Sequence, residues 1–275
     1  MEPEGLEVVV FERQGPVAIV RMNRPERLNA LNSQMHRDLI ACYRVINADP
    51  EIRAAILTGT GRYFSAGRDL KEYLDSYDNG ATDHLRPLDD PDHELFAMTG
   101  ASYPVRKPLI GALNGHVFGG GLSILLITDM IVMSSEATIT DGHARVNIGG
   151  LASLVRYLPV NIAREIAMGD RTLTAAECLQ WGFANYVVSS DEVMPKALEV
   201  TGRIAKMGPD SVAHVKQKTL EIQAELGQLL SDEARERRRA DARERLAQRV
   251  SDHDLMEGMR AFASHREATY ERPVS

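Results

Sequence analysis

The chain contains few of the residues that would assign it to several common classes of protein. Its 275 residues include only two cysteines, Cys42 and Cys178, which lie far apart and in no metal-ligand spacing. Neither a disulfide framework nor a metal site is therefore predicted. The longest apolar run, around 119–133, is interrupted by polar residues and is too short to span a bilayer. The formal net charge of −7 gives no overall attraction for nucleic acid or anionic lipid.

Several motifs that bind phosphate or supply a nucleophile are incomplete. Gly59 and Gly61 are followed by Phe64 where a dinucleotide-binding fingerprint requires glycine, and no P-loop is present. The segment 121–125 lacks the last glycine of a nucleophile elbow, and Ser123 falls inside an expected helix. A packed or hydrogen-bonded serine is the favoured interpretation of Ser123. The N-terminus has no apolar segment of a signal peptide, which together with the isolated cysteines favours a cytoplasmic protein.

The remaining pattern is typical of an α/β protein. Short apolar or β-branched runs predict strands, and apolar residues at helical spacing predict helices between them. Strands are expected at 8–11, 17–20, 54–58, 109–113 and 131–133. Helices are expected from the Asn32 cap to about Asn47 and from within 119–121. Strand–helix–strand alternation at this pace predicts parallel strands.

The C-terminal part of the sequence changes character. From Thr172 onward the pattern predicts helices alone, beginning with a capping box at 174–177 and followed by helices from 209, over 231–250 and from 252 to about 268. The interleaved charges of 233–249 indicate a solvated helix face. We therefore expect an α/β core, 1–200, and a helical C-terminal region, 201–275. The segment 77–91 is expected to be a loop that could act as a lid.

Two glycine-containing segments are the first candidates for chemistry. Segments 64–70 (Phe-Ser-Ala-Gly-Arg-Asp-Leu) and 114–121 (Asn-Gly-His-Val-Phe-Gly-Gly-Gly) each follow an expected strand and lead into a helix. Glycine allows a backbone to approach a ligand closely, and the first N–H groups of a helix have no partner within it. Two such turns that face one point would form an oxyanion hole. Two ordinary tight turns are the alternative interpretation.

Taken in order, these segments resemble those of the crotonase (enoyl-CoA hydratase/isomerase) superfamily. The matching segments are 23–31, 64–71, 114–121, 169–174 and 257–262, so the resemblance covers nearly the whole chain. It implies a spiral core of ββα units and a helical C-terminal trimerisation region, in a homotrimer or a dimer of trimers. The implied substrate is an acyl-CoA thioester, with coenzyme A as part of the substrate and no permanently bound cofactor.

The resemblance also assigns roles to residues. Its oxyanion donors correspond to the backbone N–H groups of Arg68 and Gly120. Its contacts with coenzyme A correspond to two segments, Arg27-Leu28 and the stretch that contains Ala66, Arg68, Asp69, Leu70 and Lys71. A basic residue in the last helix of such proteins often helps to bind the nucleotide phosphate, and His265 takes that position here.

Two positions depart from the pattern of the hydratases. Those enzymes carry two catalytic glutamates, and this chain has Ser123 at the first position and His143 at the second. Imidazole titrates near neutral pH, so His143 could act as acid or base, with Asp141 orienting it or acting itself. A hydrogen-bonded structural histidine is the alternative. His116 is interpreted as structural, and His84 and His93 as solvated loop residues.

Three functions remain open at this point. The leading hypothesis is an acyl-CoA lyase or isomerase that stabilises a thioester enolate and uses altered acid–base residues. A β-diketone C–C hydrolase of the same fold, which need not use coenzyme A, is the first rival. The second rival is a catalytically weak acyl-CoA binding protein. The absence of both glutamates is the reason for keeping the two rivals.

Overall fold

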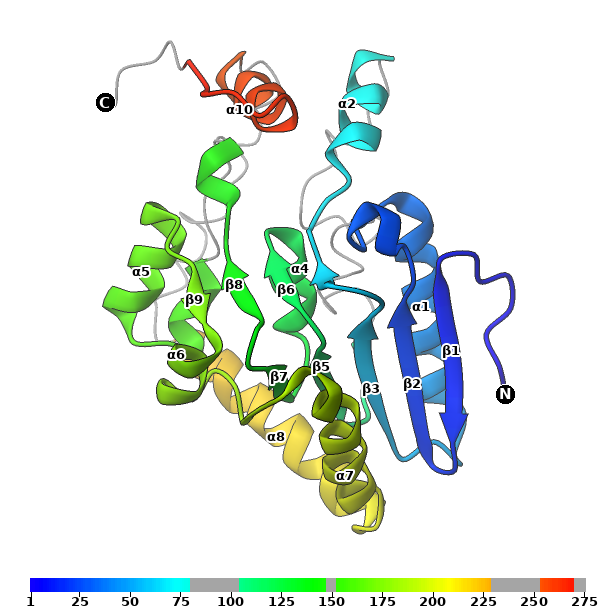
Figure 1. Ribbon diagram of the computed structural model, residues 1–275. Helices are drawn as coiled ribbons and strands as arrows, with labels where there is room; N and C mark the ends of the chain where they lie inside the picture. The colour runs from blue at the N-terminus through cyan, green and yellow to red at the C-terminus, as the bar shows by residue number, and fades with distance from the viewer. Residues whose placement is uncertain (80–103, 147–151, 229–252, 270–275) are drawn as a thin grey trace.

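The larger of two β-sheets forms the centre of the molecule in this computed structural model, which describes residues 1–79, 104–146, 152–228 and 253–269 (Figure 1). Its six strands lie in the order β1 (Val9–Gln14), β2 (Val17–Met22), β3 (Ala54–Gly59), β5 (Leu109–Leu113), β7 (Met130–Ser134) and β10 (Tyr186–Val188). β1 pairs with β2 in antiparallel fashion, and every other neighbouring pair is parallel. The predicted α/β fold with parallel strands is confirmed.

The second sheet is small and was not expected from the sequence pattern. It consists of β4 (Tyr63–Ser65), β6 (His116–Phe118), β8 (Thr138–Thr140) and β9 (Leu173–Thr174), in that order. β4, β6 and β8 are parallel to one another, and β9 is antiparallel to β8. Strands of two or three residues are too short to show the alternation of apolar and polar side chains from which strands are predicted.

The two sheets are built from a repeated unit of two strands and a helix. The first unit is β3, β4 and α2 (Leu70–Asp78), the second is β5, β6 and α4 (Gly120–Leu125), and the third is β7, β8 and the 3-10 helix η3 (His143–Val146). In each unit the first strand joins the larger sheet and the second strand joins the smaller sheet. This is the ββα spiral that the resemblance implies.

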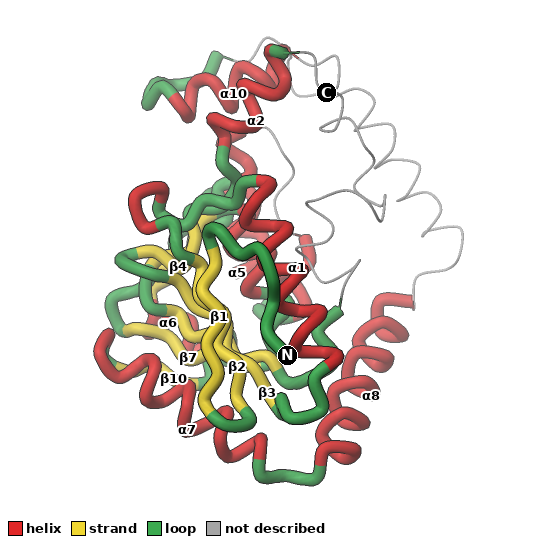
Figure 2. The backbone as a smooth tube through the Cα atoms, turned by 90° about the vertical axis from the view of Figure 1, so that its right-hand side faces the viewer, coloured by secondary structure: helices red, strands yellow, loops and turns green. Residues whose placement is uncertain are grey.

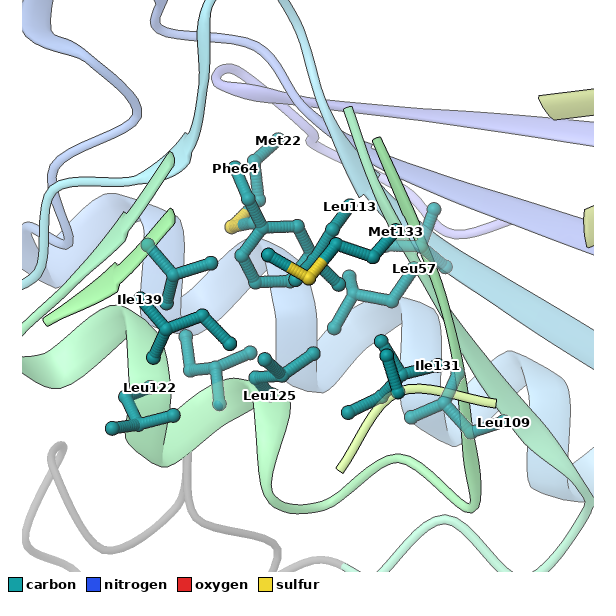
Figure 3. Close-up of a cluster of buried hydrophobic side chains, with 14 of the residues drawn as sticks. Met22, Leu57, Phe64, Leu109, Leu113, Leu122, Leu125, Ile131, Met133 and Ile139 are labelled. Atoms are coloured by element: carbon teal, nitrogen blue, oxygen red, sulfur yellow. The ribbon is translucent and has the colours of Figure 1, made fainter. Parts of the chain in front are cut away.

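Both faces of the larger sheet are buried, which explains why its parallel strands are continuously apolar. Leu57 and Met133 face a cluster formed with α1 (Ser33–Ala48), α4 and the smaller sheet (Figures 2 and 3). Ile56 and Val132, each adjacent in sequence to one of those residues, belong to a second cluster with residues of α7 (Val193–Ala205). α7 and α1 lie on opposite sides of the larger sheet (Figure 2). Side chains therefore alternate between two apolar layers, and the smaller sheet is fixed against the larger one.

The remaining elements confirm some expectations and correct others. They are η1 (Pro25–Arg27), η4 (Ala152–Arg156), α5 (Val160–Gly169), α6 (Ala175–Gln180), η5 (Ser190–Glu192), α8 (Pro209–Gln228) and α10 (His253–Ala263). The Asn32 cap and the Thr174 capping box are present. The expectation of helices alone after Thr172 was wrong, because β9 and β10 follow it. These two short strands pair with β8 and β7, which lie far away in sequence.

The bounds of two helices also differ from expectation. α2 continues to Asp78, so the loop expected from residue 77 begins later. Residues 80–91 of that segment with His84, the nearby His93 and the charged segment 231–250 lie outside the described residues. α10 ends at Ala263 because His265 adopts a left-handed conformation, φ 53°. The His265 N–H donates to the Phe262 oxygen and the Arg266 N–H to the Ala261 oxygen, a Schellman motif that closes the helix.

α10 packs against its own chain. Met259 is 1% exposed and lies in an apolar cluster with Val146 of η3, Tyr73 and Leu74 of α2, and Phe262. Within the C-terminal region that was expected to contact neighbouring subunits, Met259 and Phe262 therefore pack within their own subunit. Among the described residues, none of the helices is both long and apolar enough to cross a membrane.

Candidate active site

Three turns in equivalent places of the three ββα units bring the candidate residues together. Each turn follows the second strand of its unit: 66–69 follows β4, Gly119 follows β6, and 141–142 follows β8. Because β4, β6 and β8 are parallel neighbours, their carboxyl ends lie at one edge of the smaller sheet. Arg68, Gly120 and the Asp141–His143 segment therefore lie at the same edge, although more than 70 residues separate the first from the last.

The first two turns are in direct backbone contact, and glycines make this contact possible. A Cβ on Gly67, whose φ is +84°, would lie 2.7 Å from both the Gly120 nitrogen and the Phe118 oxygen. A Cβ on Gly121 would lie 2.6 Å from the Ser65 oxygen. A Cβ on Gly120 would lie 3.4 Å from the Arg68 nitrogen. The two nitrogens that were expected to be oxyanion donors therefore belong to main-chain segments that touch.

The third turn supplies a histidine and a carboxylate that are hydrogen-bonded to each other. Nδ1 of His143 lies 2.5 Å from Oδ1 of Asp141. The Asp141 side chain is 1% exposed, whereas the His143 side chain is 18% exposed. This turn adjoins the second one, because the Gly119 N–H donates to the oxygen of Thr140 over 3.1 Å. The arrangement gives a partly accessible imidazole that is held by a buried carboxylate.

Ser123, the other residue expected at a glutamate position, lies inside a helix, as the sequence predicted. Ser123 is half-buried within α4, the helix that begins at Gly120. It is not at a strand–helix turn, so the position of a nucleophile elbow is excluded for it. The side chain of Ser123 ends in a hydroxyl group, so it has no carboxyl group with which to hold a water molecule or a proton.

An aromatic contact beside the turns was missed from the sequence. The ring of Phe118 stacks on Phe262 of α10, with centroids 5.7 Å apart, and the Arg145 guanidinium lies 5.7 Å from the Phe118 centroid. Gly142, with φ +69°, passes so close that a Cβ would lie 2.2 Å from the Phe118 ring. The Arg68 guanidinium lies 4.2 Å from the Tyr73 centroid. Side chains of α2 and α10 thus close one side of the site, and no local sequence pattern could have indicated this.

A charged hollow of about 400 Å³ lies beside the first turn. Its charged lining consists of three basic and three acidic side chains: Arg24, Arg27, Lys71, Asp69, Glu72 and Asp75. Three of the residues expected to contact coenzyme A, Arg27, Asp69 and Lys71, are therefore brought together. Arg24 and Asp69 form an ion pair, with Nη2 and Oδ2 3.1 Å apart. Leu28 and Ala66 are linked to each other in this region by the hydrogen bond of the Ala66 N–H to the Leu28 oxygen, 2.9 Å.

The last of the expected contact residues is placed differently. His265 was expected within the last helix, but it is exposed and follows the end of α10. Its neighbour Arg266 is bound to Glu257, with Nη1 2.6 Å from Oε1. Within the described ranges, the acidic, histidine and cysteine side chains form no group of three or more that could hold a metal ion.

The comparisons with known proteins agree with the fold. The family model described as Enoyl-CoA hydratase/isomerase matches residues 12–273. A carnitinyl-CoA dehydratase of Proteus mirabilis is 33% identical over 258 residues, which cover 92% of this chain and 94% of that protein. A carnitinyl-CoA dehydratase of Citrobacter koseri is 31% identical over 265 residues, which cover 94% and 97%.

Solved structures with the same fold also have related descriptions. The structure of a methylmalonyl-CoA decarboxylase in complex with 2-nitronate-propionyl-CoA superposes with a TM-score of 0.82 at 25% identity, over 97% of this chain and 99% of that one. The structure of a carnitinyl-CoA dehydratase from Mycobacterium avium gives a TM-score of 0.74 at 26% identity, over 96% and 98%.

Proposed function

This chain belongs to the enoyl-CoA hydratase/isomerase family, and from that premise we propose that it is a lyase or isomerase that acts on an acyl-CoA thioester through an enolate. Coenzyme A is part of the substrate, and no permanently bound cofactor takes part. The observation that carries the proposal is the contact of the first two turns, where a Cβ on Gly120 would lie 3.4 Å from the Arg68 nitrogen.

In this proposal the N–H groups of Arg68 and Gly120 donate to the thioester oxygen. Loss of a proton from the adjacent carbon moves negative charge onto that oxygen, and donors fixed in advance stabilise the charge without reorganising. Gly120 has no side chain to obstruct the thioester. Three glycine contacts between the turns support a site that is rigid at its backbone.

His143 is proposed to transfer the proton, and Asp141 to orient it. The buried carboxylate accepts the Nδ1 hydrogen, which leaves Nε2 as the nitrogen that exchanges a proton with the substrate. Ser123, which takes the other glutamate position, can hydrogen-bond but cannot remove a proton without an activating base. One acid–base group therefore takes the place of the two carboxyl groups of a hydratase.

The charged hollow is proposed to receive coenzyme A. Arg27 and Lys71 provide positive charge for its phosphates, and the backbone of Ala66 to Leu70 connects the hollow to the thioester position. His265, which is exposed beyond the end of α10 and does not line the hollow, is proposed to contribute less to nucleotide binding than Lys71. Mutation of Lys71 should therefore weaken binding of acyl-CoA more strongly than mutation of His265.

Exchange of the α-proton tests the enolate without knowledge of the natural acyl group. Butyryl-CoA is incubated with the protein in D₂O, and deuterium at the α-carbon is measured by mass spectrometry. We expect exchange with the wild-type protein and a loss of roughly a hundredfold or more in His143→Ala, the usual contribution of a positioned acid or base. Binding of butyryl-CoA, measured by calorimetry, should change little in that variant.

His116→Ala is the matched control for this experiment. His116 is also half-buried and also hydrogen-bonded through Nδ1, here to Oγ1 of Thr138 over 2.9 Å, but it precedes the turn rather than following β8. The His116→Ala variant should exchange the α-proton as the wild-type protein does. Absence of exchange in the wild-type protein, together with turnover of CoA-free β-diketones, would favour the diketone hydrolase instead. Tight binding without any turnover would favour the acyl-CoA binding protein.

Decarboxylation of a malonyl-type CoA thioester is a second candidate function. Breaking the bond to the carboxylate releases CO₂ and leaves its electron pair on the thioester as the same enolate, so no base is required and only a proton donor remains necessary. The absence of a carboxyl group at Ser123 favours this reaction, as does the TM-score of 0.82 with a methylmalonyl-CoA decarboxylase. Release of CO₂ from methylmalonyl-CoA or malonyl-CoA is the measurement that decides.

A further inference from the structure

We infer that Ser65, together with Asn29, is a positioning residue that fixes the Arg68 N–H group in the proposed oxyanion hole. The inference rests on the proposed function and deepens it. Both residues are 0% exposed, and the inference assigns neither of them a contact with the substrate. They act on the main chain that carries the donor.

The Ser65 hydroxyl connects the first turn to a neighbouring segment of the chain. Ser65 is 0% exposed, and its Oγ donates to the Asn29 oxygen over 2.8 Å. Oγ of Ser65 also accepts a hydrogen bond from the Gly67 N–H over 3.1 Å. A hydroxyl has one donor and two acceptor sites, so this single group can hold both segments. Gly67 directly precedes Arg68, and its carbonyl group forms the peptide bond with the Arg68 nitrogen. The hydrogen bond to the Gly67 N–H therefore restrains the residue that positions this nitrogen.

This restraint matters because Gly67 has wide conformational freedom. Its φ of +84° lies in a region that glycine enters readily, and glycine can also leave it readily. A rotation of that residue would turn the following peptide plane and move the Arg68 N–H. The hydrogen bond from the Gly67 N–H to Ser65 opposes the rotation at one end of the residue. The hydrogen bond from the Leu31 N–H to the Gly67 oxygen, 2.7 Å, opposes it at the other end.

Asn29 holds the other side of the arrangement in place. Leu28 and Asn29 both have left-handed backbone angles, φ 52° and 53°, which are uncommon for residues other than glycine. The Asn29 side chain is fully buried and makes three hydrogen bonds to backbone. Its Oδ1 accepts the Arg24 N–H over 2.9 Å, and its Nδ2 donates to the oxygens of Thr60 and Tyr63 over 2.9 and 2.8 Å.

The Asn29 bonds therefore fix the oxygen to which Ser65 donates. The turn after Arg68 is also held by this segment, because the Asp69 N–H donates to the Leu31 oxygen over 3.0 Å. The Arg68 nitrogen consequently lies between two restrained residues. A donor that is fixed before charge develops is what enolate stabilisation requires.

Ser65→Ala is the test, and the chain offers a close control. Ser134 is also 0% exposed, also accepts the N–H of the residue two positions later, Glu136, over 3.2 Å, and also shares a hydrogen bond, with Ser190 over 2.7 Å. It lies on β7, away from the turns. Ser134→Ala therefore removes the same kind of buried hydroxyl without touching the proposed site.

The readout is the preference of each protein for an enolate-like ligand over an ordinary thioester. Dissociation constants are measured for propionyl-CoA and for 2-nitronate-propionyl-CoA, whose deprotonated α-carbon shares its negative charge with the nitro and thioester oxygens. We expect Ser65→Ala to bind propionyl-CoA nearly as the wild-type protein does. It should bind the nitronate roughly ten- to a hundredfold more weakly, the effect of a misplaced donor. Ser134→Ala should keep the wild-type preference.

The outcomes separate this inference from the proposed function. A wild-type protein without preference for the nitronate would overturn the proposed function itself. A wild-type preference that Ser65→Ala retains in full would overturn the positioning role and leave the proposed function intact. If Ser65→Ala does not fold, Ser65→Cys keeps the side-chain volume with a weak hydrogen-bonding group. A full nitronate preference in Ser65→Cys would overturn the inference in the same way.

Discussion

Replacement of Gly120 by valine should remove most of the catalysis and leave the fold intact. A Cβ at this position would lie 3.4 Å from the Arg68 nitrogen, 3.5 Å from Cδ1 of Leu31 and 3.6 Å from the Gly67 Cα. Alanine would therefore meet its neighbours at ordinary contact distance. Valine adds two methyl groups to that Cβ, and with three neighbours so close at least one must move or the thioester oxygen must be displaced.

The size of the effect follows from what is lost. If the substituted backbone no longer presents both donors to one oxygen, the cost is that of one oxyanion donor, roughly 2 to 4 kcal/mol of transition-state stabilisation, or about 30- to 1000-fold in rate. Overpacking at a buried site costs about 1–3 kcal/mol of folding free energy. Since domains are stable by roughly 5–15 kcal/mol, the variant should remain folded.

The assay is α-proton exchange in D₂O on a thioester that the wild-type protein processes, with circular dichroism and thermal unfolding as measures of the fold. Gly202→Val is the control, because Gly202 lies in α7 and, apart from its chain neighbours and the backbone of its own helix, no described atom lies within 4 Å of the position of its Cβ. It should exchange protons at the wild-type rate. Full activity of Gly120→Val on the true substrate would refute the oxyanion hole, and with it the argument for an enolate.

Four further outcomes are expected. Hydration of crotonyl-CoA should be roughly a hundredfold or more slower than in a good hydratase, because we place Ser123 and His143 at the positions of its two carboxyl groups; a typical hydratase turnover would contradict this placement. Sedimentation should show trimers or hexamers, and a stable monomer at micromolar concentration would count against the predicted assembly. Thr174→Ala should destabilise the protein by about 0.5–2 kcal/mol in urea unfolding, because it removes the capping box of α6. Burial raises the pKa of the Cys42 and Cys178 thiols from 9.0 to about 12. The unfolding free energy should therefore fall as the pH rises above about 9, since only the unfolded thiols then ionise; constant stability up to pH 11 would contradict this.

The parts of the fold that could be predicted are those with a local signal. β5 (Leu109–Leu113) was predicted at its observed bounds because it is an uninterrupted apolar run that ends at a turn. The Thr174 cap was predicted because its partner Glu177 lies only three residues away. In both cases the residues that determine the structure are neighbours in sequence, so their pattern can be recognised without knowledge of the tertiary contacts.

The last strand of the larger sheet, β10, and the side wall of the site have no such local signal. β10 (Tyr186–Val188) pairs with β7, more than 50 residues earlier, and its three residues would not form a strand without that partner. The stacking of Phe118 on Phe262 joins residues from the middle and the end of the chain. The sequences of the turns indicated which backbone N–H groups lie at the starts of helices. Only the parallel order of β4, β6 and β8 brings those turns to one edge of the smaller sheet.

The three turns differ in what they contribute, so in the proposed site the acid–base residues can vary without a change in the proposed backbone donors. The first two turns contribute main-chain N–H groups, and their contact depends on the glycines at 67 and 121, where an added Cβ would lie 2.7 and 2.6 Å from backbone atoms. The third turn contributes side chains, Asp141 and His143, whose identity is not constrained by that contact. Replacing a carboxyl group at the third turn or within α4 therefore leaves the donors of the oxyanion hole where they are. It changes only how a proton reaches or leaves the enolate.

Within this fold, the residues at 123, 141 and 143 should consequently determine which reaction is catalysed. The double substitution Ser123→Glu with His143→Glu should raise crotonyl-CoA hydration more than either substitution alone, because two carboxyl groups must hold one water molecule.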